Sequence, residues 1–289
     1  MSMLNTINAR MRSTALLLMG LAGIFSACQK EIDFDYHEIA PIVVVEGRIT
    51  NEGTKVTITR SRSVSDSVKG RCIPNATVVV SAEGMKQAIG YDAKADCYKS
   101  ALKGTPGTTY RLDIDLDGQH YEASSFMPYP APISSAEFLW QDIINERMLA
   151  YEVWAADPQP SERNYYWYRM DRISHHPHFI GKTSTESYRW NVFDDRGCPP
   201  GQVYRDVMCM SERMAEEDEK ENWKSILYEG DTITFQLMTI DRAVYDFFTS
   251  LRAGQGGGAN PRSNITGGCL GYFAAGSVTH ADTVVYHQQ

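Results

Sequence analysis

The 289-residue chain carries 36 acidic and 28 basic side chains, which gives a formal net charge of −8. This acidic balance argues against a protein that binds nucleic acid or anionic membranes through its charge, because both need a basic face. Hydrophobic residues make up 43 % and charged residues 22 % of the chain, as in globular proteins, and the length indicates two domains.

Residues 1–27 have the pattern of a secretory signal. Two arginines precede an apolar run over 15–27, which is too short to span a membrane. The run ends in Phe-Ser-Ala before Cys28, and small residues before a cysteine resemble the lipobox of bacterial lipoproteins. Such a cysteine carries acyl chains that hold the protein on a membrane. We therefore expect a lipid anchor at Cys28; a plain signal peptide with a coincidental cysteine is the alternative.

Residues 28–40 are expected to form an acidic tether. Cys28 is followed by Gln29, Lys30 and Glu31, and a Gln-Lys-acidic string at this place resembles the surface-export signal of Bacteroidota lipoproteins. This resemblance implies an outer-membrane location with the protein facing the cell exterior. A solvated tether, kept extended by its charges, is the other interpretation.

The segment 41–127 predicts a β-sandwich. Asp117-Gly118 favours a tight hairpin turn between two alternating runs. About seven strands in about 85 residues are typical of an Ig-like or transthyretin-like sandwich. The expected strands are 42–49, 55–60, 76–81, 110–116 and 119–125, with weaker segments near Ala88 and Tyr98.

A proline-rich linker over 128–134 is the expected domain boundary, because proline lacks the donor that a central strand or helix needs. Residues 135–289 are expected to form a larger β-rich domain with two short helices, which makes the whole chain mainly β. One helix is predicted over 211–228. The other should begin at Asp241, a good N-cap, and end at the glycine-rich loop 254–258. The expected strands are 148–155, 164–173, 187–193, 232–240 and 277–286.

Five cysteines remain after Cys28. An exported chain meets an oxidising compartment, where disulfides form. We expect Cys72 to pair with Cys97 and Cys198 with Cys209, which leaves Cys269 as a small buried side chain. The chain has no C-x-x-C pair, so neither a zinc site nor another cofactor is expected.

The chain carries no familiar catalytic motif, and we do not expect an enzyme. It lacks the G-x-S-x-G elbow, the H-E-x-x-H helix and the kinase motifs. His175, His176 and His178 could bind a metal, but their proline-containing segment is more typical of an exposed loop. The acidic pair Asp194-Asp195 is loop-like. A glycosidase pair stays open, because its carboxylates meet only in space.

The densest aromatic patch lies over 164–168 and is a candidate partner surface. Strand alternation places Tyr165 and Trp167 on one side and Tyr166 and Tyr168 on the other. Core packing on both faces is one interpretation. The other is a partner surface, shared with the late loop. Its candidate residues are Tyr165, Trp167, Asn260, Asn264 and Tyr272.

Three short motifs resemble the O-glycosylation signal of exported Bacteroidota proteins, in which a hydroxyl residue lies between an aspartate and an aliphatic residue. The candidate acceptors are Ser67, Thr232 and Thr283.

Several features together resemble a Bacteroidota outer-membrane lipoprotein family labelled as a domain of unknown function. They are the lipobox with its tether, the strand VVVEGRIT, the runs IPNATVVVSAEG and GTTYRLDI, and the late string NPRSNITGGCLGYFAA. The late string is the most specific, although Cys269 interrupts the usual passage from the glycine pair into Leu-Gly-Tyr-Phe. The first domain is also similar to regulatory sandwiches attached to carboxypeptidases and TonB-dependent receptors.

The resemblance implies an accessory role beside a TonB-dependent transport barrel in nutrient uptake, with binding as the activity. It implies no catalytic residue and no particular ligand. The alternatives are a structural or assembly subunit of an outer-membrane complex, and a surface hydrolase.

Overall fold

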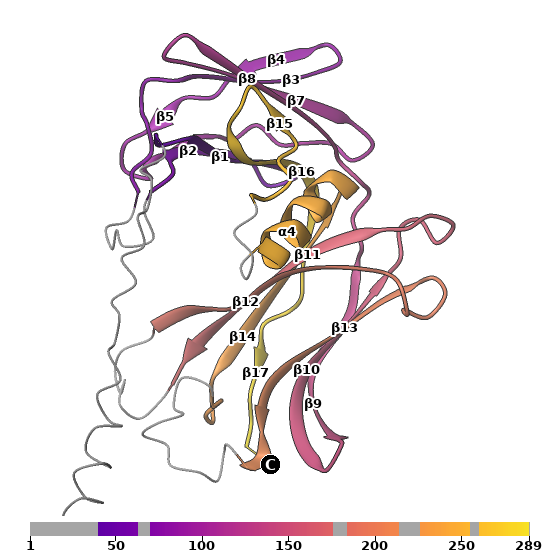
Figure 1. Ribbon diagram of the computed structural model, residues 1–289. Helices are drawn as coiled ribbons and strands as arrows, with labels where there is room; N and C mark the ends of the chain where they lie inside the picture. The colour runs from indigo at the N-terminus through magenta and orange to yellow at the C-terminus, as the bar shows by residue number, and fades with distance from the viewer. Residues whose placement is uncertain (1–39, 63–69, 176–183, 214–225, 255–259, 289) are drawn as a thin grey trace, which may run out of the picture. The chain divides into compact units, whose positions relative to one another are not determined.

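The computed structural model describes residues 40–62, 70–175, 184–213, 226–254 and 260–288. Residues Pro41–Gln289 form one compact unit. The unit is mainly β, as predicted, and its described strands form three sheets, shown with the helix α4 (Arg242–Gly254) in Figure 1. No helix in these ranges is long and apolar enough to cross a membrane.

The nine-stranded sheet is the centre of the unit. Its strands, in spatial order, are β12 (Ser184–Asp194), β11 (Tyr165–Ser174), β14 (Thr232–Ile240), β16 (Leu270–His280), β1 (Val43–Thr50), β2 (Thr54–Arg60), β6 (Cys97–Ser100) and β5 (Tyr91–Asp92), with β17 (Val284–Val285) paired to β14. The pair β1–β16 is parallel and the other neighbours are antiparallel.

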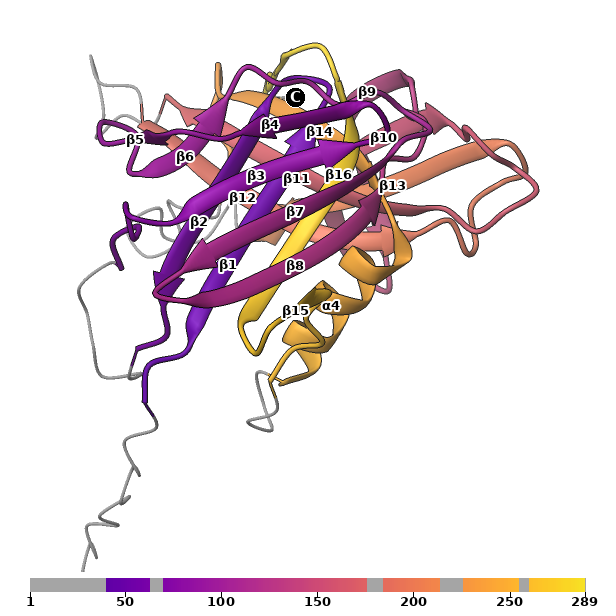
Figure 2. The ribbon, with the colours of Figure 1, turned by 90° about the horizontal axis from the view of Figure 1, so that it is seen from above.

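Two smaller sheets cover one face of this central sheet. The five-stranded sheet has the order β15 (Ile265–Thr266), β8 (Gln119–Phe126), β7 (Thr109–Leu116), β3 (Thr77–Ala82) and β4 (Met85–Ala88). Its strands cross those of the central sheet obliquely, as Figure 2 shows. The three-stranded sheet has the order β13 (Gln202–Ser211), β10 (Glu146–Ala156) and β9 (Ile133–Ile143).

Strand alternation divides the apolar side chains among three cores. The first lies between the five-stranded sheet and β1, β2 and β16, where Val45, Leu112 and Phe273 are fully buried. The second lies between the three-stranded sheet and β11 and β14. The third lies on the opposite face of the central sheet, where α4 packs on Trp167 and Tyr272. The strands β11, β12, β14 and β16 of the central sheet therefore send alternate residues into different cores.

The expected self-contained sandwich over 41–127 differs from the observed architecture. This segment contributes eight strands to two sheets, and β15 and β16, from the C-terminal part of the chain, complete both sheets. The seven-stranded Ig-like or transthyretin-like form is therefore not found. The reason is the β1–β16 pair, which joins residues more than 200 positions apart and has no local sequence signal.

The predicted proline-rich linker lies against the structure. The carbonyl of Pro128 accepts a hydrogen bond from the Ser277 hydroxyl, and that of Ala131 accepts one from Thr279 Oγ1 at 2.9 Å. Ala131 is buried, and β9 already begins at Ile133. The segment therefore runs beside β16, and along it the chain passes from the first core, which contains Met127, to the second, which contains Ala131.

One of the two predicted helices is described. It is α4, which follows Asp241 as expected. The other was expected over 211–228, but Ser211 is the last residue of β13 and residues 214–225 lie outside the described ranges.

Asp241 joins three elements through one carboxylate. Its Oδ1 accepts the Val244 N–H at 2.9 Å and caps α4, while its Oδ2 accepts the Ser125 hydroxyl and the Phe126 N–H from β8. Ser125 Oγ in turn accepts the Ala275 N–H of β16 at 2.9 Å. Burial raises the pKa of Asp241 above its ordinary value, although these hydrogen bonds oppose the shift.

The raised pKa of Asp241 predicts a pH dependence of stability. A carboxyl whose folded pKa lies above its unfolded pKa stabilises the fold while protonated, and this contribution is lost as the pH rises through the folded pKa. Asp241→Asn removes the ionisation. The free energy of unfolding of the variant minus that of the wild type should therefore increase as the pH rises. Urea unfolding between about pH 3 and pH 8 measures this. The changed hydrogen bonds of the variant add an offset that does not depend on pH. If the stability of the two proteins varied with pH in parallel, the raised pKa of Asp241 would be contradicted.

The β1–β16 contact predicts a severe effect of a single methyl group at Gly271. This glycine has φ +116°, and a Cβ there would lie 1.8 Å from the Val45 carbonyl oxygen. Gly271→Ala should therefore reduce the free energy of unfolding by about 3 kcal/mol or more. Gly84→Ala is the matched control, because Gly84 has φ +70° with open space around it and should lose only about 1 kcal/mol. Chemical denaturation of both variants is the measurement, and equal losses would contradict the contact.

Candidate functional site

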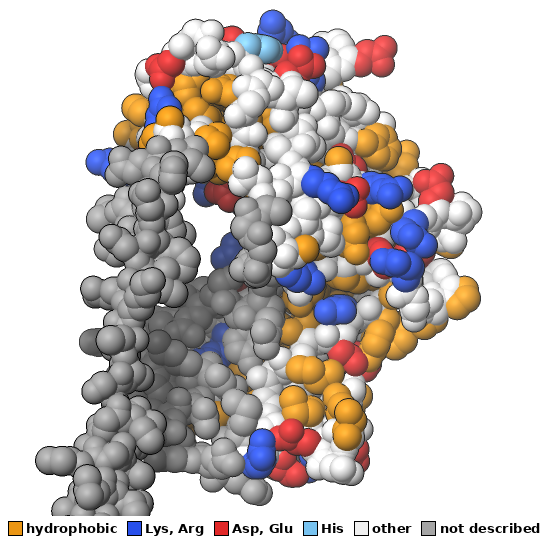
Figure 3. Space-filling model, viewed as in Figure 1, with side chains coloured by type: hydrophobic (Ala, Val, Ile, Leu, Met, Phe, Trp, Pro, Cys, Tyr) orange, Lys and Arg blue, Asp and Glu red, His pale blue; other side chains and the backbone are white. Residues whose placement is uncertain are grey.

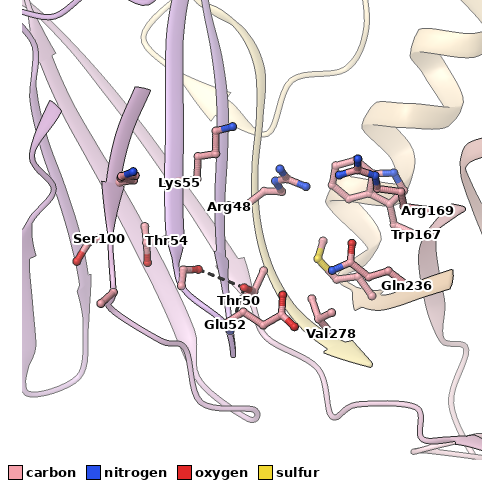
Figure 4. Close-up of a pocket in the computed structure, with 14 residues that line it drawn as sticks. Arg48, Thr50, Glu52, Thr54, Lys55, Ser100, Trp167, Arg169, Gln236 and Val278 are labelled. Atoms are coloured by element: carbon pink, nitrogen blue, oxygen red, sulfur yellow. Dashed lines mark hydrogen bonds between the residues drawn. The ribbon is translucent and has the colours of Figure 1, made fainter. Parts of the chain in front are cut away.

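The uncovered part of the central sheet forms a hollow next to α4. The two smaller sheets cover the opposite face, and among the described elements α4 covers this one over β12, β11, β14 and β16. The hollow has a volume of about 630 Å³, and its lining comes from both halves of the chain, as Figure 4 shows. Arg48 and Lys55 line one side; Trp167, Arg169 and Gln236 line the other.

Trp167 forms a rigid wall of the hollow. It is 1 % exposed and packs on Phe248 and Tyr272, with ring centroids 4.4 Å and 5.6 Å away. The guanidinium carbon of Arg48 lies 5.5 Å from the centroid of the Trp167 ring. A cation–π contact of this kind orients the guanidinium while its charge stays beside the hollow.

The cations of the hollow lie on adjacent strands. Arg48 on β1 is directly opposite Lys55 on β2, which is directly opposite Lys99 on β6. Lys99 forms an ion pair with Asp92 at 2.8 Å, and this pair raises the pKa of Lys99. Lys55 is exposed and forms no ion pair with any described side chain. Across the hollow, Arg169 forms an ion pair with Asp171 at 2.7 Å.

The rim of the hollow is fixed by the turn between β1 and β2. Asn51 binds the backbone of Val278 on β16 twice, donating from Nδ2 at 3.0 Å and accepting at Oδ1 at 2.7 Å. Next to it, the carboxylate of Glu52 pairs with His280. These contacts hold β1 against β16 at the point where the two sides of the hollow meet, so the site is formed before any ligand arrives.

The predicted aromatic surface is largely core. Trp167 and Tyr272 are buried, and Tyr165 is half-buried against Tyr245. Asn264 bonds to Phe273 twice, through its Nδ2 to the carbonyl and through its Oδ1 to the N–H. Of the late-loop candidates, Asn260 is exposed. Core packing on both faces of 164–168 is therefore what the structure shows, with Trp167 reaching only the edge of the hollow.

The expected disulfides are not found, because none of the described cysteines forms a disulfide bond. Cys198 accepts the Tyr204 N–H at its Sγ, at 3.5 Å. Cys209 lies five residues further along β13, about 16 Å away at the rise of a strand, whereas a bridge needs Cα atoms within about 7 Å. Strand geometry therefore rules out the Cys198–Cys209 pair.

Cys72 and Cys97 lie closer together. The Cys72 N–H donates to Asp96 Oδ2 at 3.2 Å, next to Cys97 in the chain, and both thiols are buried. Burial raises the pKa of the Cys72 thiol above its ordinary value, and it raises the pKa of the Cys269 thiol to about 11. The structure has all three as thiols.

The remaining predicted candidates lie away from the hollow or outside the description. His175 is exposed, while His176, His178 and Ser67 are not described. Thr232 begins β14 next to the buried Asp231, and Thr283 is exposed.

The acidic pair Asp194-Asp195 is engaged locally. Burial raises the pKa of Asp194, but the Arg196 guanidinium, at 2.8 Å, outweighs this effect and leaves the pKa below its ordinary value. Asp195 Oδ2 accepts the Asn164 N–H at 2.8 Å. These carboxylates therefore hold two loops together at the end of β11 and β12.

The outer face of the five-stranded sheet carries one group that could hold a metal. Ligand atoms of Asp113, His120 and Glu122 lie within 4.8 Å of one another. The guanidinium of Arg111, however, pairs with both carboxylates at 2.9 Å. Arg111 thus supplies the positive charge at this place, and the group is a surface ion-pair network.

The turn between β9 and β10 exposes a strained apolar tip. Ile144 is 89 % exposed and has φ +54°, a conformation that β-branched residues rarely adopt. Ile143 is also exposed, and charged side chains lie beside the tip, including the Arg147–Glu212 pair at 3.0 Å. Figure 3 shows hydrophobic side chains in several small groups on the viewed face, among them one over the three-stranded sheet.

Comparison with the curated proteins gave no match. A family model described as a domain of unknown function (DUF4249) matches residues 29–282, which include every element of the hollow and the apolar tip. This match confirms the prediction that the chain belongs to a family labelled as a domain of unknown function. The chain belongs to the DUF4249 family, a domain of unknown function.

Proposed function

We propose that this chain is a lipid-anchored binding protein of the outer membrane and that it serves as an accessory to a TonB-dependent transport barrel. The hollow is the observation that supports this proposal most directly. Its volume of about 630 Å³ is that of a small-molecule site, and polar side chains converge on it from five strands of one sheet, β1, β2, β6, β11 and β14. A chain that served only in assembly would have no use for such a site.

The anchor is argued from the sequence. The apolar run before Cys28 and the small residues next to it fit a lipoprotein signal, and about forty residues separate the N-terminus from the first strand. Several acyl chains would hold the protein at the membrane surface. The string Gln29, Lys30 and Glu31 supports a location on the outer side of the cell.

The exposed tip of the β9–β10 hairpin is the proposed contact with the barrel. An apolar centre with a charged rim is typical of protein interfaces. Three carboxylates near the tip, those of Asp142, Glu146 and Glu212, disfavour an anionic membrane as the partner. Holding Ile144 at positive φ costs about 1–2 kcal/mol, a strain that the isolated fold does not need.

Cys28→Ala tests the anchor. The variant should leave the membrane fraction after a wash that releases peripherally bound proteins, because the acyl chains are the only proposed anchor in the bilayer itself, and its mass should show no acyl chains. Cys269→Ala is the matched control and should stay membrane-bound.

Replacing Lys30 and Glu31 with alanine should keep the anchor but protect the protein from protease added to whole cells. Cys28→Ala protein that remains in the membrane would contradict the anchor.

Ile144→Asn tests the contact. Asparagine tolerates the left-handed region, so the free energy of unfolding should rise by about 0.5–1 kcal/mol while the apolar contact is lost. The yield of a TonB-dependent barrel that co-purifies with the chain, identified by mass spectrometry, should fall at least about five-fold.

Leu251→Gln on α4 is the control for this experiment, because it removes an exposed apolar side chain away from the tip. Its barrel yield should equal that of the wild type. Unchanged co-purification with Ile144→Asn would rule out the tip as the contact.

A further inference from the structure

The positive charges of the hollow are arranged in a row that folding does not require. Arg48, Lys55 and Lys99 are direct cross-strand neighbours on β1, β2 and β6. With strands about 4.8 Å apart, the three cations span about 10 Å. Like charges directly opposite each other destabilise a sheet. A row of three such positions therefore points to a role in binding.

The protein compensates this row only in part. Asp92 pairs with Lys99, and the Trp167 ring faces the Arg48 guanidinium. Lys55, in the middle of the row, forms no ion pair with any described side chain. Among the described residues, Glu52 is the one carboxylate that lines the hollow, and it is paired with His280.

The opposite side of the hollow supplies further donors and an apolar surface. Arg169 brings a fourth cation to the lining, and the Gln236 side chain lies beside it, as Figure 4 shows. Met238 and Val278 provide an apolar patch between the two sides. In a chain with a formal net charge of −8, four basic side chains and one acidic side chain of the described residues thus line the hollow.

From this arrangement we infer that the hollow binds a small organic polyanion, a molecule with two or more carboxylate, phosphate or sulfate groups on a compact skeleton. The inference rests on the proposed binding function and specifies its ligand. One acidic group would lie between Arg48 and Lys55, where it meets two positive charges on adjacent strands. A second would reach Lys99 or Arg169, and the skeleton would lie over the patch of Met238 and Val278.

Calorimetric titration of the full mature chain in detergent tests the inference. The probes are citrate, inorganic pyrophosphate and a sulfated disaccharide, which separate carboxylate, phosphate and sulfate as the acidic group; acetate and glucose are the controls. At least one polyanion should bind, with an affinity that falls as the salt concentration rises. Lys55→Gln should weaken that binding at least about ten-fold. Lys86→Gln on β4, also an exposed lysine on a strand, should not change it.

A second measurement distinguishes lost binding from lost folding. Because Lys55→Gln removes the central charge of the row, the melting temperature of the ligand-free variant at low salt should rise or stay equal, and should not fall. Failure of all three polyanions to bind, or equal binding by Lys55→Gln, would overturn the inference. Binding of glucose alone would also overturn it and would leave the proposed binding function standing. Loss of barrel co-purification with Ile144→Asn bears only on the proposed function.

Discussion

The position of β16 between β1 and β14 is the constraint on which the rest of the structure depends. The strand approaches both neighbours closely through glycines. A Cβ at Gly271 would collide with the Val45 carbonyl, and one at Gly276 would lie 2.7 Å from Met238 Cγ. Because residues of β16 alternate, Phe273 and Ala275 complete the first core, while Tyr272 and Ala274 complete the third. One strand thus closes two cores and makes the central sheet continuous.

The hollow is a direct consequence of that continuity. Arg48 and Lys55 come from the first strands of the chain, whereas Trp167 and Gln236 come from strands more than one hundred residues later. Only β16 holds these two groups at a fixed separation within the sheet. The Asn51–Val278 hydrogen bonds and the Asp241–Ser125 contact, which reaches β16 at Ala275, add further ties to this strand. A ligand that contacts both sides would therefore meet a site whose width is set by backbone pairing.

Local chemistry could be predicted from the sequence, but long-range pairing could not. The turn at Asp117-Gly118, both at positive φ, the cap at Asp241 and the alternation of 164–168 follow from neighbouring residues, and the structure confirms them. The parallel β1–β16 pair joins distant segments without a turn between them, so no local pattern indicates it. To an interpretation that does not include the β1–β16 pair, the proline-rich segment 128–134 has the pattern of a linker, and residues 41–127 have the pattern of a complete sandwich.

The same limit explains the errors at the candidate site. Alternation shows which side chains share a face of a strand, not which element covers that face, so Trp167 could be taken for a surface residue. The alternation within β1 does predict that Arg48 lies on the polar face of its strand, and the alternation within β2 predicts the same for Lys55. That these two side chains form a row with Lys99 follows only from the register of three strands. This register depends on a core to which β16 contributes.

The two proposed contacts lie on opposite sides of the central sheet. The β9–β10 hairpin belongs to the three-stranded sheet, which covers the face that carries Tyr166 and Tyr168; the hollow opens on the face that carries Trp167 and Arg169. A ligand in the hollow and a partner at the tip therefore do not compete for the same surface. Both faces share β11 and β14, and in β11 Trp167 and Tyr168 are adjacent residues packed into different cores. Any ligand-induced shift of these strands would thus reach the second core, on which the hairpin rests, through a single peptide bond.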